Sequence, residues 1–313
     1  MTRRRVAVTG SAGRLGRALV DVFGVSGESL LEVARPKLDI TNADDRARIE
    51  SWRPDIIINA AAWTDVDGCA RDPERAHIVN GRAAGDLAET AANCGARLIH
   101  VSTNEVFAGD GDRPYEPGDP VRPRSAYGAS KALGEELVAA SHASSTIVRT
   151  AWLFGPQGAN FVTKILAAAE RAASTDTPLR VVDDEWGNPT WIPALADRIR
   201  ALVNDAAIPP IVHVAGAPAA SRHAWAAEVL VVARSRARLI PISSDAFDRA
   251  SDPPRRAILA LTPENTVDWR HANERYVTAL ADASSRISEA IRSEDPPSSA
   301  PTARSSASDR TAR

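Results

Sequence analysis

The stretch "RVAVTGSAGRLG", residues 5–16, predicts the fold of this 313-residue chain. Its first six residues form a short apolar run, which predicts a buried strand, and apolar residues at helical spacing follow. Between the two lie Gly10, Gly13 and Gly16. A loop this tight needs glycine where the backbone turns or approaches a phosphate, and the next helix offers free N–H groups at its N-terminus. The stretch therefore predicts a strand–loop–helix unit that binds a dinucleotide.

Short apolar runs and helical patterns alternate through the first half of the chain. Such alternation predicts parallel strands with helices on both faces of the sheet. We therefore expect an α/β fold with a Rossmann-like, doubly wound parallel sheet. The expected strands are 5–10, 30–34, 55–62, 97–103 and the beginning of 145–155, and the expected helices are 13–23, 44–52, 73–95 and 125–141.

The second half of the chain is less regular. We expect helices over 160–172 and 221–234, a strand over 210–216, and a strand followed by a Gly/Pro loop within 178–192. Residues 1–155 are expected to form the NADP-binding domain, and segments after residue 155 can contribute to its core. Residues 156–285 are expected to form mainly a smaller substrate-binding region. Residues 293–313 are rich in Ser, Pro, Ala and Arg, which predicts a disordered tail.

Composition excludes several classes of function. The net charge of −2 gives no basis for binding nucleic acid or a membrane surface, and no apolar run is long enough to span a bilayer. Cys69 and Cys94 form no Cys-x-x-Cys pair, so we expect two reduced thiols in a cytoplasmic protein. The six histidines form no ligand-spaced cluster, and "DDE" (183–185) is interpreted as a solvated acidic loop, so no metal site is expected.

The end of the second expected strand bears on the choice of nicotinamide cofactor. NAD usually meets an acid there, whereas NADP meets an arginine that holds its 2′-phosphate. The strand ends "EVARP" (32–36), with Arg35 and no acid after Val33. This favours NADPH and leaves NADH open, the alternative being that Arg35 is an ordinary arginine on a solvated loop. Asp39 is expected near the adenine.

Tyr127 and Lys131 stand four residues apart in "SAYGASKALGEE" (125–136), in a chain with three tyrosines and three lysines. On a helix the two side chains share one face. The pair follows a strand that ends "VST" (101–103), and parallel sheets bind ligands at the carboxyl ends of their strands. We therefore expect Tyr127 and Lys131 to face a bound dinucleotide.

The chemistry of ketone reduction explains this pair. Hydride transfer creates an alkoxide that needs a proton, and a phenol is a suitable donor. A neighbouring cation stabilises the phenolate and lowers the pKa of Tyr127. The compact ammonium of Lys131 does this and also donates to ribose hydroxyls, whereas an arginine is planar and bulkier. A third group must bind the carbonyl oxygen, and we prefer Thr103 to Ser102.

Taken together, these stretches resemble the extended short-chain dehydrogenase/reductase superfamily, and within it the dTDP-4-dehydrorhamnose reductase family. The resemblance covers about residues 5–270. It rests on "TGSAGRLG", "LDITN", "RPDIIINAAAWTDVDGCARDPERAHIVN", "GARLIHVSTNEVFAG", "PVRPRSAYGASKALGE", "VRTAWLFG", "NFV" and "DEWGNPT". It implies NADPH-dependent reduction of the 4-keto group of a dTDP-linked keto-6-deoxysugar, with dTDP-4-dehydrorhamnose as the first candidate.

The resemblance also implies site residues. The catalytic triad falls on Thr103, Tyr127 and Lys131, and the substrate contacts fall on Thr103, Asn104 and Trp152. Cofactor contacts are expected from Tyr127, Lys131 and the loops at the sheet edge: Gly10, Ala12, Gly13, Arg14, Leu15, Gly16, Arg35, Asp39, Ile40, Ala60, Ala61 and Ala62. The oligomeric state is left open, with a homodimer as one option.

Two departures from the family pattern concern the sugar. Members usually read Ser-Thr-Asp-Tyr-Val-Phe after the fourth strand, whereas this chain reads "STNEVF" (102–107), with Asn104 for the acid and Glu105 for the aromatic residue. The later loop "PPRRAILAL" (253–261) also differs from the family pattern. Both segments are expected to face the nucleotide sugar. A 4-ketoreductase for another deoxysugar nucleotide is therefore an open alternative.

Two further alternatives lie outside ketone reduction. A related dehydratase or epimerase would share the triad, but a dehydratase needs an acid–base pair beside the threonine, and Asn104 stands in the first of those places. A non-catalytic NADP-binding regulatory subunit is the other alternative, and the intact Tyr127–Lys131 pair argues against it. Arg255 and Arg256 are candidates for holding a diphosphate, and Trp186 and Trp191 for stacking on a base or for core packing.

Overall fold

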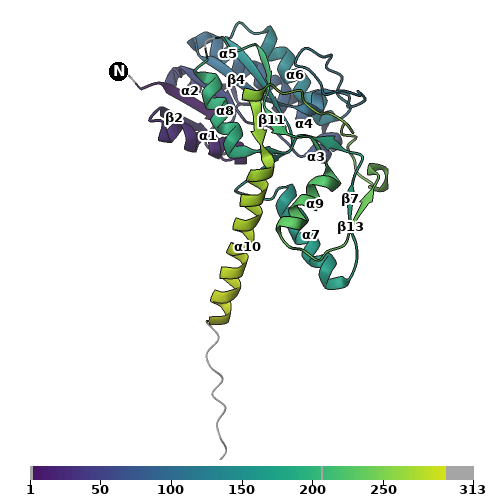
Figure 1. The fold of residues 1–313 in the computed structure, drawn as a ribbon. Helices are drawn as coiled ribbons and strands as arrows, with labels where there is room; N and C mark the ends of the chain where they lie inside the picture. The colour runs from purple at the N-terminus through teal and green to yellow at the C-terminus, as the bar shows by residue number, and fades with distance from the viewer. Residues whose placement is uncertain (1–2, 206, 294–313) are drawn as a thin grey trace, which may run out of the picture.

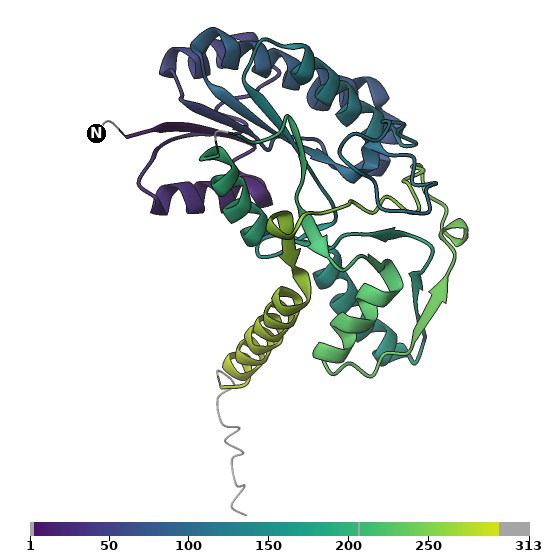
Figure 2. The ribbon, with the colours of Figure 1, turned by 45° about the horizontal axis from the view of Figure 1, so that its top comes forward.

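The computed structural model describes residues 3–205 and 207–293, and the side chains of 284–293 are not described. A body built on a large sheet and a smaller group of helices and strands lie beside each other, and one long helix runs out from between them (Figures 1 and 2). The expected disordered tail lies, apart from Ser293, outside the described residues.

The large sheet has six strands in the order β10-β5-β4-β3-β1-β2, and every neighbouring pair is parallel. This confirms the Rossmann-like, doubly wound α/β fold. Five strands come from the first half of the chain, and the sixth, β10, comes from beyond residue 155. The strands are β1 (Arg5–Thr9), β2 (Ser29–Val33), β3 (Ile56–Asn59), β4 (Arg97–Thr103), β5 (Ser145–Thr150) and β10 (Ile211–His213).

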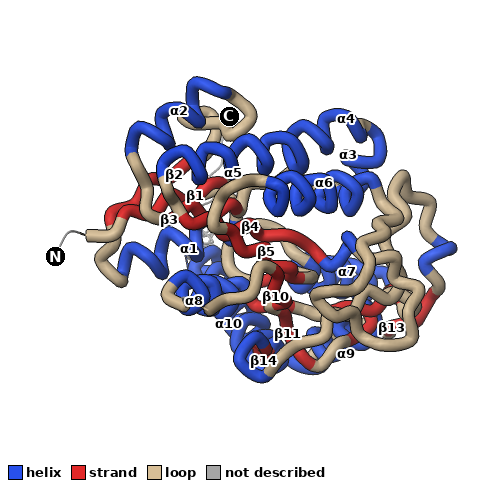
Figure 3. The backbone as a smooth tube through the Cα atoms, turned by 90° about the horizontal axis from the view of Figure 1, so that it is seen from above, coloured by secondary structure: helices blue, strands red, loops and turns tan. Residues whose placement is uncertain are grey.

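Helices cover both faces of this sheet (Figure 3). On one face lie α1 (Arg14–Val25) and α8 (Ile192–Val203), and on the other α2 (Ala43–Trp52), α5 (Ala83–Cys94) and α6 (Ala126–Ala140). Successive side chains of a strand point to opposite faces of the sheet, so the residues of β1 contribute to the apolar cores on both faces. Val6 and Val8 pack with α1 and α8, whereas Ala7 packs with the helices of the other face.

The smaller region has its own core, centred on the buried Phe154, Trp225 and Trp269. It contains α7 (Phe161–Thr175), α9 (Arg222–Val232) and the beginning of α10 (Trp269–Ser293). Its strands pair two by two: β7 (Leu179–Val182) with β13 (Leu239–Ile242), β6 (Leu153–Phe154) with β9 (Thr190–Trp191), β8 (Trp186–Gly187) with β12 (Ala220–Ser221), and β11 (Ala215–Ala217) with β14 (Thr266–Asp268).

Several elements differ from those expected. The helix expected over 73–95 is divided into α4 (Pro73–Ala76), a π-helical segment (His77–Arg82) and α5, and it ends at Gly95 in the left-handed conformation, as expected. The helices α3 (Val66–Arg71), α8 and α10 and the strand β13 were not expected. In the described ranges, no helix, α10 included, is both long enough and apolar enough to cross a bilayer.

Candidate active site

The first turn of α6 places Tyr127. Ser125 is the N-cap, and its hydroxyl accepts a hydrogen bond from the backbone N–H of Gly128. A Cβ at position 128 would overlap the carbonyl oxygen of Glu105, so the glycine lets α6 pack directly on the turn that follows β4. Tyr127 and Lys131 are both buried one turn apart on this helix, and Thr103 ends β4 beside them.

Thr103 lies close enough to Tyr127 to influence its phenol, which brings two of the three predicted catalytic residues together. The pKa of Tyr127 lies above the ordinary value, because burial disfavours the phenolate and the carboxylate of Glu105 adds a negative charge; the polar side chain of Thr103 acts in the opposite direction. The net shift is opposite to the lowering expected from Lys131. Burial therefore decides the protonation state of Tyr127, and the phenol keeps its proton at neutral pH.

Lys131 lies beneath this pair. Its Nζ donates to the carbonyl oxygen of Val101 at 2.8 Å and lies 3.3 Å from Nε2 of His100. Burial lowers the pKa of Lys131 to about 8, while the carboxylate of Glu135 acts to raise it. The side chain therefore carries its positive charge at neutral pH. Nothing in the sequence pattern had indicated His100, whose buried ring lies below Lys131.

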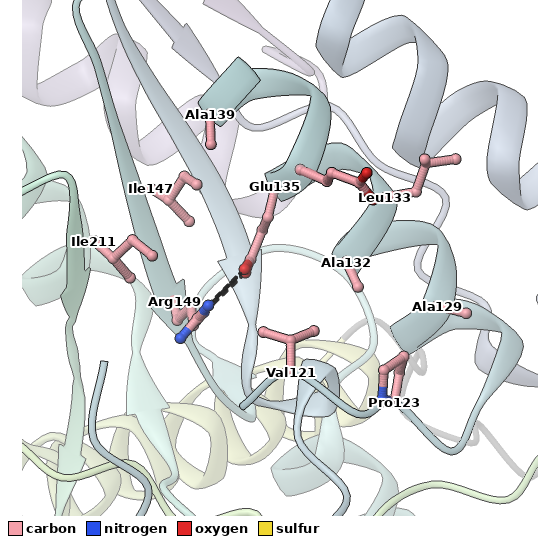
Figure 4. A pocket seen from close by; sticks show the side chains of 11 residues that line it. Val121, Pro123, Ala129, Ala132, Leu133, Glu135, Ala139, Ile147, Arg149 and Ile211 are labelled. Atoms are coloured by element: carbon pink, nitrogen blue, oxygen red, sulfur yellow. Dashed lines mark hydrogen bonds and ion pairs between the residues drawn. The ribbon is translucent and has the colours of Figure 1, made fainter. Parts of the chain in front are cut away.

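Glu135 points from α6 toward β5, where an ion pair with Arg149 balances its charge (Figure 4). Arg149 of β5 donates two hydrogen bonds to it, with a shortest distance of 2.7 Å, and both side chains are buried. The pair borders a cavity of about 550 Å³, lined mainly by apolar side chains such as Val121, Ile147 and Ile211. This cavity contains none of the predicted catalytic or cofactor residues.

A second cavity, of about 330 Å³, lies at the carboxyl ends of β1, β2 and β3. It brings together most of the residues predicted to contact the cofactor. Its lining comprises Gly10, Ala12, Gly13, Arg35, Asp39, Ile40, Ala60, Ala61 and Ala62, together with Val33, Ala34, Leu38, Thr41 and Val79. The location agrees with the general position of ligand sites in open α/β sheets.

The glycine loop beside this cavity fits a diphosphate. Gly10 has φ +66°, and a Cβ there would lie 2.7 Å from the carbonyl oxygen of Ala60, so the two loops approach as backbone alone. Gly13 is the N-cap of α1, and no described side chain caps this helix end. The first N–H groups of the helix are therefore left for an anion.

Five predicted cofactor contacts do not line the cavity: Tyr127 and Lys131 of α6, described above, and Arg14, Leu15 and Gly16. A Cβ on Gly16 would overlap the carbonyl oxygen of Gly10, so Gly16 serves the packing of the loop. The side chain of Leu15 lies in the core between the sheet and α1. Arg14 reaches across to the smaller region, where its Nη1 donates to the carbonyl oxygen of Leu153 at 3.2 Å.

Arg35 and Asp39 lie at the far end of the cavity. Arg35 is exposed, and its Nε lies 4.0 Å from Oδ2 of Asp39. The other carboxylate oxygen of Asp39 accepts hydrogen bonds from the backbone N–H and the hydroxyl of Thr41, both at 2.9 Å. Asp39 thus fixes the loop after β2, and the guanidinium of Arg35 remains accessible at the cavity's edge.

Trp152 packs against the core of the smaller region. Its backbone has φ +45°, which is uncommon for a bulky residue and indicates that the surrounding structure holds it in place. The indole packs so closely on Gly187 that a Cβ there would lie 2.6 Å from it. The guanidinium of Arg222 lies over the indole, 3.6 Å from the ring centroid.

The expectation of a solvated acidic loop at 183–185 is wrong for Glu185. This side chain is buried, and its carboxylate lies 2.5 Å from Arg249 and 3.6 Å from Arg222. A buried carboxylate requires such partners, because an unpaired charge in the interior is costly. Sequence spacing cannot reveal this, because the three residues are far apart along the chain.

The two departures from the family pattern lie together at this place. Asn104 is buried, and its Nδ2 donates to the carbonyl oxygen of Ala257 at 2.8 Å, which ties it to the unusual late loop. Glu105 accepts a hydrogen bond from the hydroxyl of Ser125 at 2.9 Å. Burial raises the pKa of Glu105, while the positive charge of Arg222 acts to lower it. Glu105 is therefore part of the site beside Tyr127 and is more than a loop charge.

Other candidates from the sequence have structural partners. Arg255 forms ion pairs with Asp184 and Asp245, and Arg256 lies over the ring of Trp186 at 5.4 Å. Trp191 packs in the core of the smaller region. Both cysteines are free, as expected. Within the described part of the chain, no three His, Cys, Asp or Glu side chains form a group that could hold a metal ion.

The chain was compared with known proteins. The family model described as "RmlD substrate binding domain" matches residues 4–292. The dTDP-4-dehydrorhamnose reductase of Streptomyces griseus is 37% identical over 297 residues, which cover 91% of this chain and 96% of that protein. The dTDP-4-keto-6-deoxy-D-glucose reductase of Streptomyces niveus is 35% identical over 286 residues, which cover 89% and 96%.

A solved structure is also similar. The dTDP-4-dehydrorhamnose reductase of Bacillus anthracis str. Ames, in complex with NADP, superposes with a TM-score of 0.82 at 29% identity and covers 89% of this chain and 100% of its own. The similarity extends over the sheet and the smaller region alike. From its sequence and its fold, the chain therefore belongs to the RmlD family, that of the dTDP-4-dehydrorhamnose reductases.

Proposed function

We propose that this protein catalyses the NADPH-dependent reduction of the 4-keto group of a dTDP-4-keto-6-deoxysugar, with dTDP-4-dehydrorhamnose as the substrate and dTDP-rhamnose as the product. The observation that carries the proposal is the placement of Thr103, at the end of β4, beside Tyr127, in the first turn of α6. This pair lies above the charged Lys131 and shares a sheet edge with a cavity lined by a glycine loop. Membership of the family supports the same reaction.

In the proposed reaction, the residues of the chain position the ketone and manage one proton. NADPH, when bound, supplies the hydride. The hydroxyl of Thr103 hydrogen-bonds the carbonyl oxygen, and the phenol of Tyr127, which holds its proton at neutral pH, donates that proton to the same oxygen as the new C–H bond forms. The ammonium of Lys131 stabilises the phenolate that remains and holds the ribose of the cofactor.

The preference for NADPH over NADH rests on Arg35. The cavity has an arginine at the position after β2 where NAD-binding proteins usually carry an acid. The guanidinium is exposed, and its only partner among the described residues is the Asp39 carboxylate, 4.0 Å from Nε, so in the proposed complex its Nη groups pair with a 2′-phosphate. The relative of known structure that was bound to NADP supports this choice.

A second candidate is the reduction of another dTDP-linked keto-deoxysugar. Two observations favour it: Asn104 and Glu105 replace an acid and an aromatic residue in the site, and a relative named for the reduction of dTDP-4-keto-6-deoxy-D-glucose is nearly as similar as one named for dTDP-4-dehydrorhamnose. An amide and a carboxylate have different hydrogen-bonding capacities from the residues they replace. The orientation of the sugar depends on them.

The test is to mix the purified protein with NADPH and, separately, with dTDP-4-dehydrorhamnose and dTDP-4-keto-6-deoxyglucose, and to follow the oxidation of NADPH. We expect turnover with dTDP-4-dehydrorhamnose and a product with the mobility of dTDP-rhamnose. Turnover with the glucose derivative alone would establish the second candidate. Tight binding of NADPH without turnover of either sugar would support a regulatory subunit instead. Sedimentation of the same preparation would show whether the protein is a homodimer.

A further inference from the structure

A line of buried polar side chains runs from β1 through the sheet to Lys131. Thr9 Oγ1 lies 2.7 Å from Asn59 Oδ1, Asn59 Nδ2 lies 3.0 Å from His100 Nδ1, and His100 Nε2 lies 3.3 Å from Lys131 Nζ. Lys131 in turn donates to the carbonyl oxygen of Val101 at 2.8 Å. The four side chains of this line are almost completely shielded from solvent. Their hydrogen-bond donors and acceptors therefore face protein groups, in one another and in the nearby backbone, and not water.

The direction of these hydrogen bonds follows from one backbone group. The N–H of Ala61 can only donate, and it lies 3.2 Å from Oδ1 of Asn59. The same N–H has a second acceptor in Oγ1 of Thr9, at 3.3 Å, but an NH₂ in the place of Oδ1 would face it as a second donor. The amide of Asn59 therefore has its oxygen toward Ala61 and its NH₂ toward His100. Nδ1 of His100 must therefore accept, and the ring proton of the neutral imidazole lies on Nε2.

This tautomer conflicts with a charged lysine. The Nε2–H of His100 points at Nζ of Lys131, where a neutral amine can accept it but an ammonium, which has no lone pair, cannot. The tautomer with its proton on Nδ1 has the same kind of conflict at another place, because its Nδ1–H and the NH₂ of Asn59 are both donors and face each other. Only when Lys131 is neutral does no donor in the line face another donor.

We propose that His100 is a positioning residue that holds its N–H against Lys131 and so makes this lysine release its proton more readily than burial alone would. The other charged and titratable neighbours are on α6 and β5: Glu135, which favours the ammonium, Arg149, which is paired with Glu135, and Tyr127 above.

The effect on turnover rests on the proposed function. If charged Lys131 stabilises the phenolate of Tyr127, the rate of reduction falls as pH rises through the pKa of Lys131, near pH 8. Without His100 this alkaline limb would move to higher pH. The effect of His100 on the pKa of Lys131 can be measured without turnover, so this test does not depend on the identity of the substrate.

The chain is well suited to that measurement, because Lys37, Lys131 and Lys164 are its only lysines. Replacing Lys37 and Lys164, both exposed, with arginine leaves one signal in the protein labelled with [ε-¹³C]lysine, and its chemical shift can be titrated. In the same protein, ¹⁵N-histidine spectra report which nitrogen of the buried ring carries the proton. We expect the Nε2–H tautomer in the unmodified site.

His100→Gln tests the contact directly, since a glutamine can turn its carbonyl oxygen toward the ammonium. We expect the pKa of Lys131 to rise by about one unit, which corresponds to one recovered hydrogen bond. Ser130→Ala is the matched control: it removes a buried hydroxyl next to Lys131 that bonds Asn80 and does not touch Nζ, and it should leave the pKa unchanged.

Asn59→Asp is the second variant, in case His100→Gln does not fold. The carboxylate would accept from Nδ1, turn Nε2 into an acceptor and raise the pKa of Lys131. An Nδ1–H tautomer in the unmodified site would overturn the proposal. So would the same pKa of Lys131 in the parent protein and in whichever variant folds.

Discussion

The guanidinium of Arg222 lies between the indole of Trp152, 3.6 Å from its ring centroid, and the buried carboxylate of Glu185, 3.6 Å away. We expect Arg222→Ala to lower the free energy of unfolding by about 3 kcal/mol, because the stacking is lost and Glu185 keeps only Arg249 as a partner. Arg222→Lys should cost less, since the charge remains. Urea denaturation measures both values.

Arg270→Ala provides the matched control, because Arg270 forms an ion pair with Glu228 on the surface. Such pairs contribute at most about 1 kcal/mol. Equal losses of stability in Arg222→Ala and Arg270→Ala would show that the contacts of Arg222 with Trp152 and Glu185 stabilise the fold no more than a surface ion pair does.

The close approach of the loops at Gly10 predicts a specific loss of cofactor binding. Gly10 and Gly27 both have positive φ, so Gly10→Ala and Gly27→Ala should each lose about 1 kcal/mol of stability from backbone strain. Only at Gly10 would the new Cβ meet another backbone, that of Ala60; at Gly27 it would have no neighbour within 4 Å among the described residues. We expect Gly10→Ala alone to weaken NADPH binding, by more than about tenfold, in a fluorescence titration. Equal affinities in the two variants would contradict the phosphate role of the loop.

The raised pKa of Glu105 predicts a gain of stability in Glu105→Gln. In the folded protein, burial disfavours the charged carboxylate of Glu105. This lowers the free energy of unfolding, but only as pH rises above the pKa that the carboxyl has in the unfolded chain, because at lower pH the group is protonated in both states. Glutamine resembles the protonated acid and keeps an acceptor for Ser125. The variant should therefore be more stable than the parent at pH 7 and equally stable below about pH 4. A difference that does not depend on pH would indicate another cause.

His213 predicts acid sensitivity. Burial, with the positive charge of Arg149 as a second cause, lowers the pKa of His213 to about 4. Since an unfolded histidine titrates near 6.5, the unfolded chain binds the extra proton first, and stability falls as pH drops from 6.5 toward 4, by up to about 3 kcal/mol. His213→Asn, whose amide can still donate to Ala260, should flatten this dependence, whereas His142→Asn at an exposed position should not. Parallel pH profiles for the two variants would contradict the assignment.

The sequence was most informative where function depends on local spacing. The glycine triplet follows one strand and opens one helix, and Tyr127 and Lys131 are one turn apart, so both patterns can be recognised without any tertiary contact. The alternation of strand and helix patterns along the chain likewise predicted the parallel sheet. These features are encoded within a few consecutive residues.

The residues that were missed act through contacts between distant segments. In the sequence, His100 is an ordinary strand residue, and its contact with Lys131 arises only from the packing of β4 against α6. Glu185 is likewise an acid in an expected loop, and its contact with Arg222 arises only from the position of α9. The regular apolar residues of α8, such as Leu195 and Ile199, do indicate a helix, but its place beside α1 depends on the chain returning to the first sheet. The upward shift in the pKa of Tyr127 also could not be predicted, because it depends on burial and on Glu105.

The central claim is that Tyr127 delivers the proton in a reduction by bound NADPH, and Tyr127→Phe tests it most directly. The change removes only the hydroxyl of a buried side chain, so the fold and the cavity at the glycine loop should persist. With dTDP-4-dehydrorhamnose and NADPH, we expect kcat to fall by at least about a hundredfold while the dissociation constant of NADPH stays within about twofold of the parent value. Unchanged turnover in Tyr127→Phe would contradict the account.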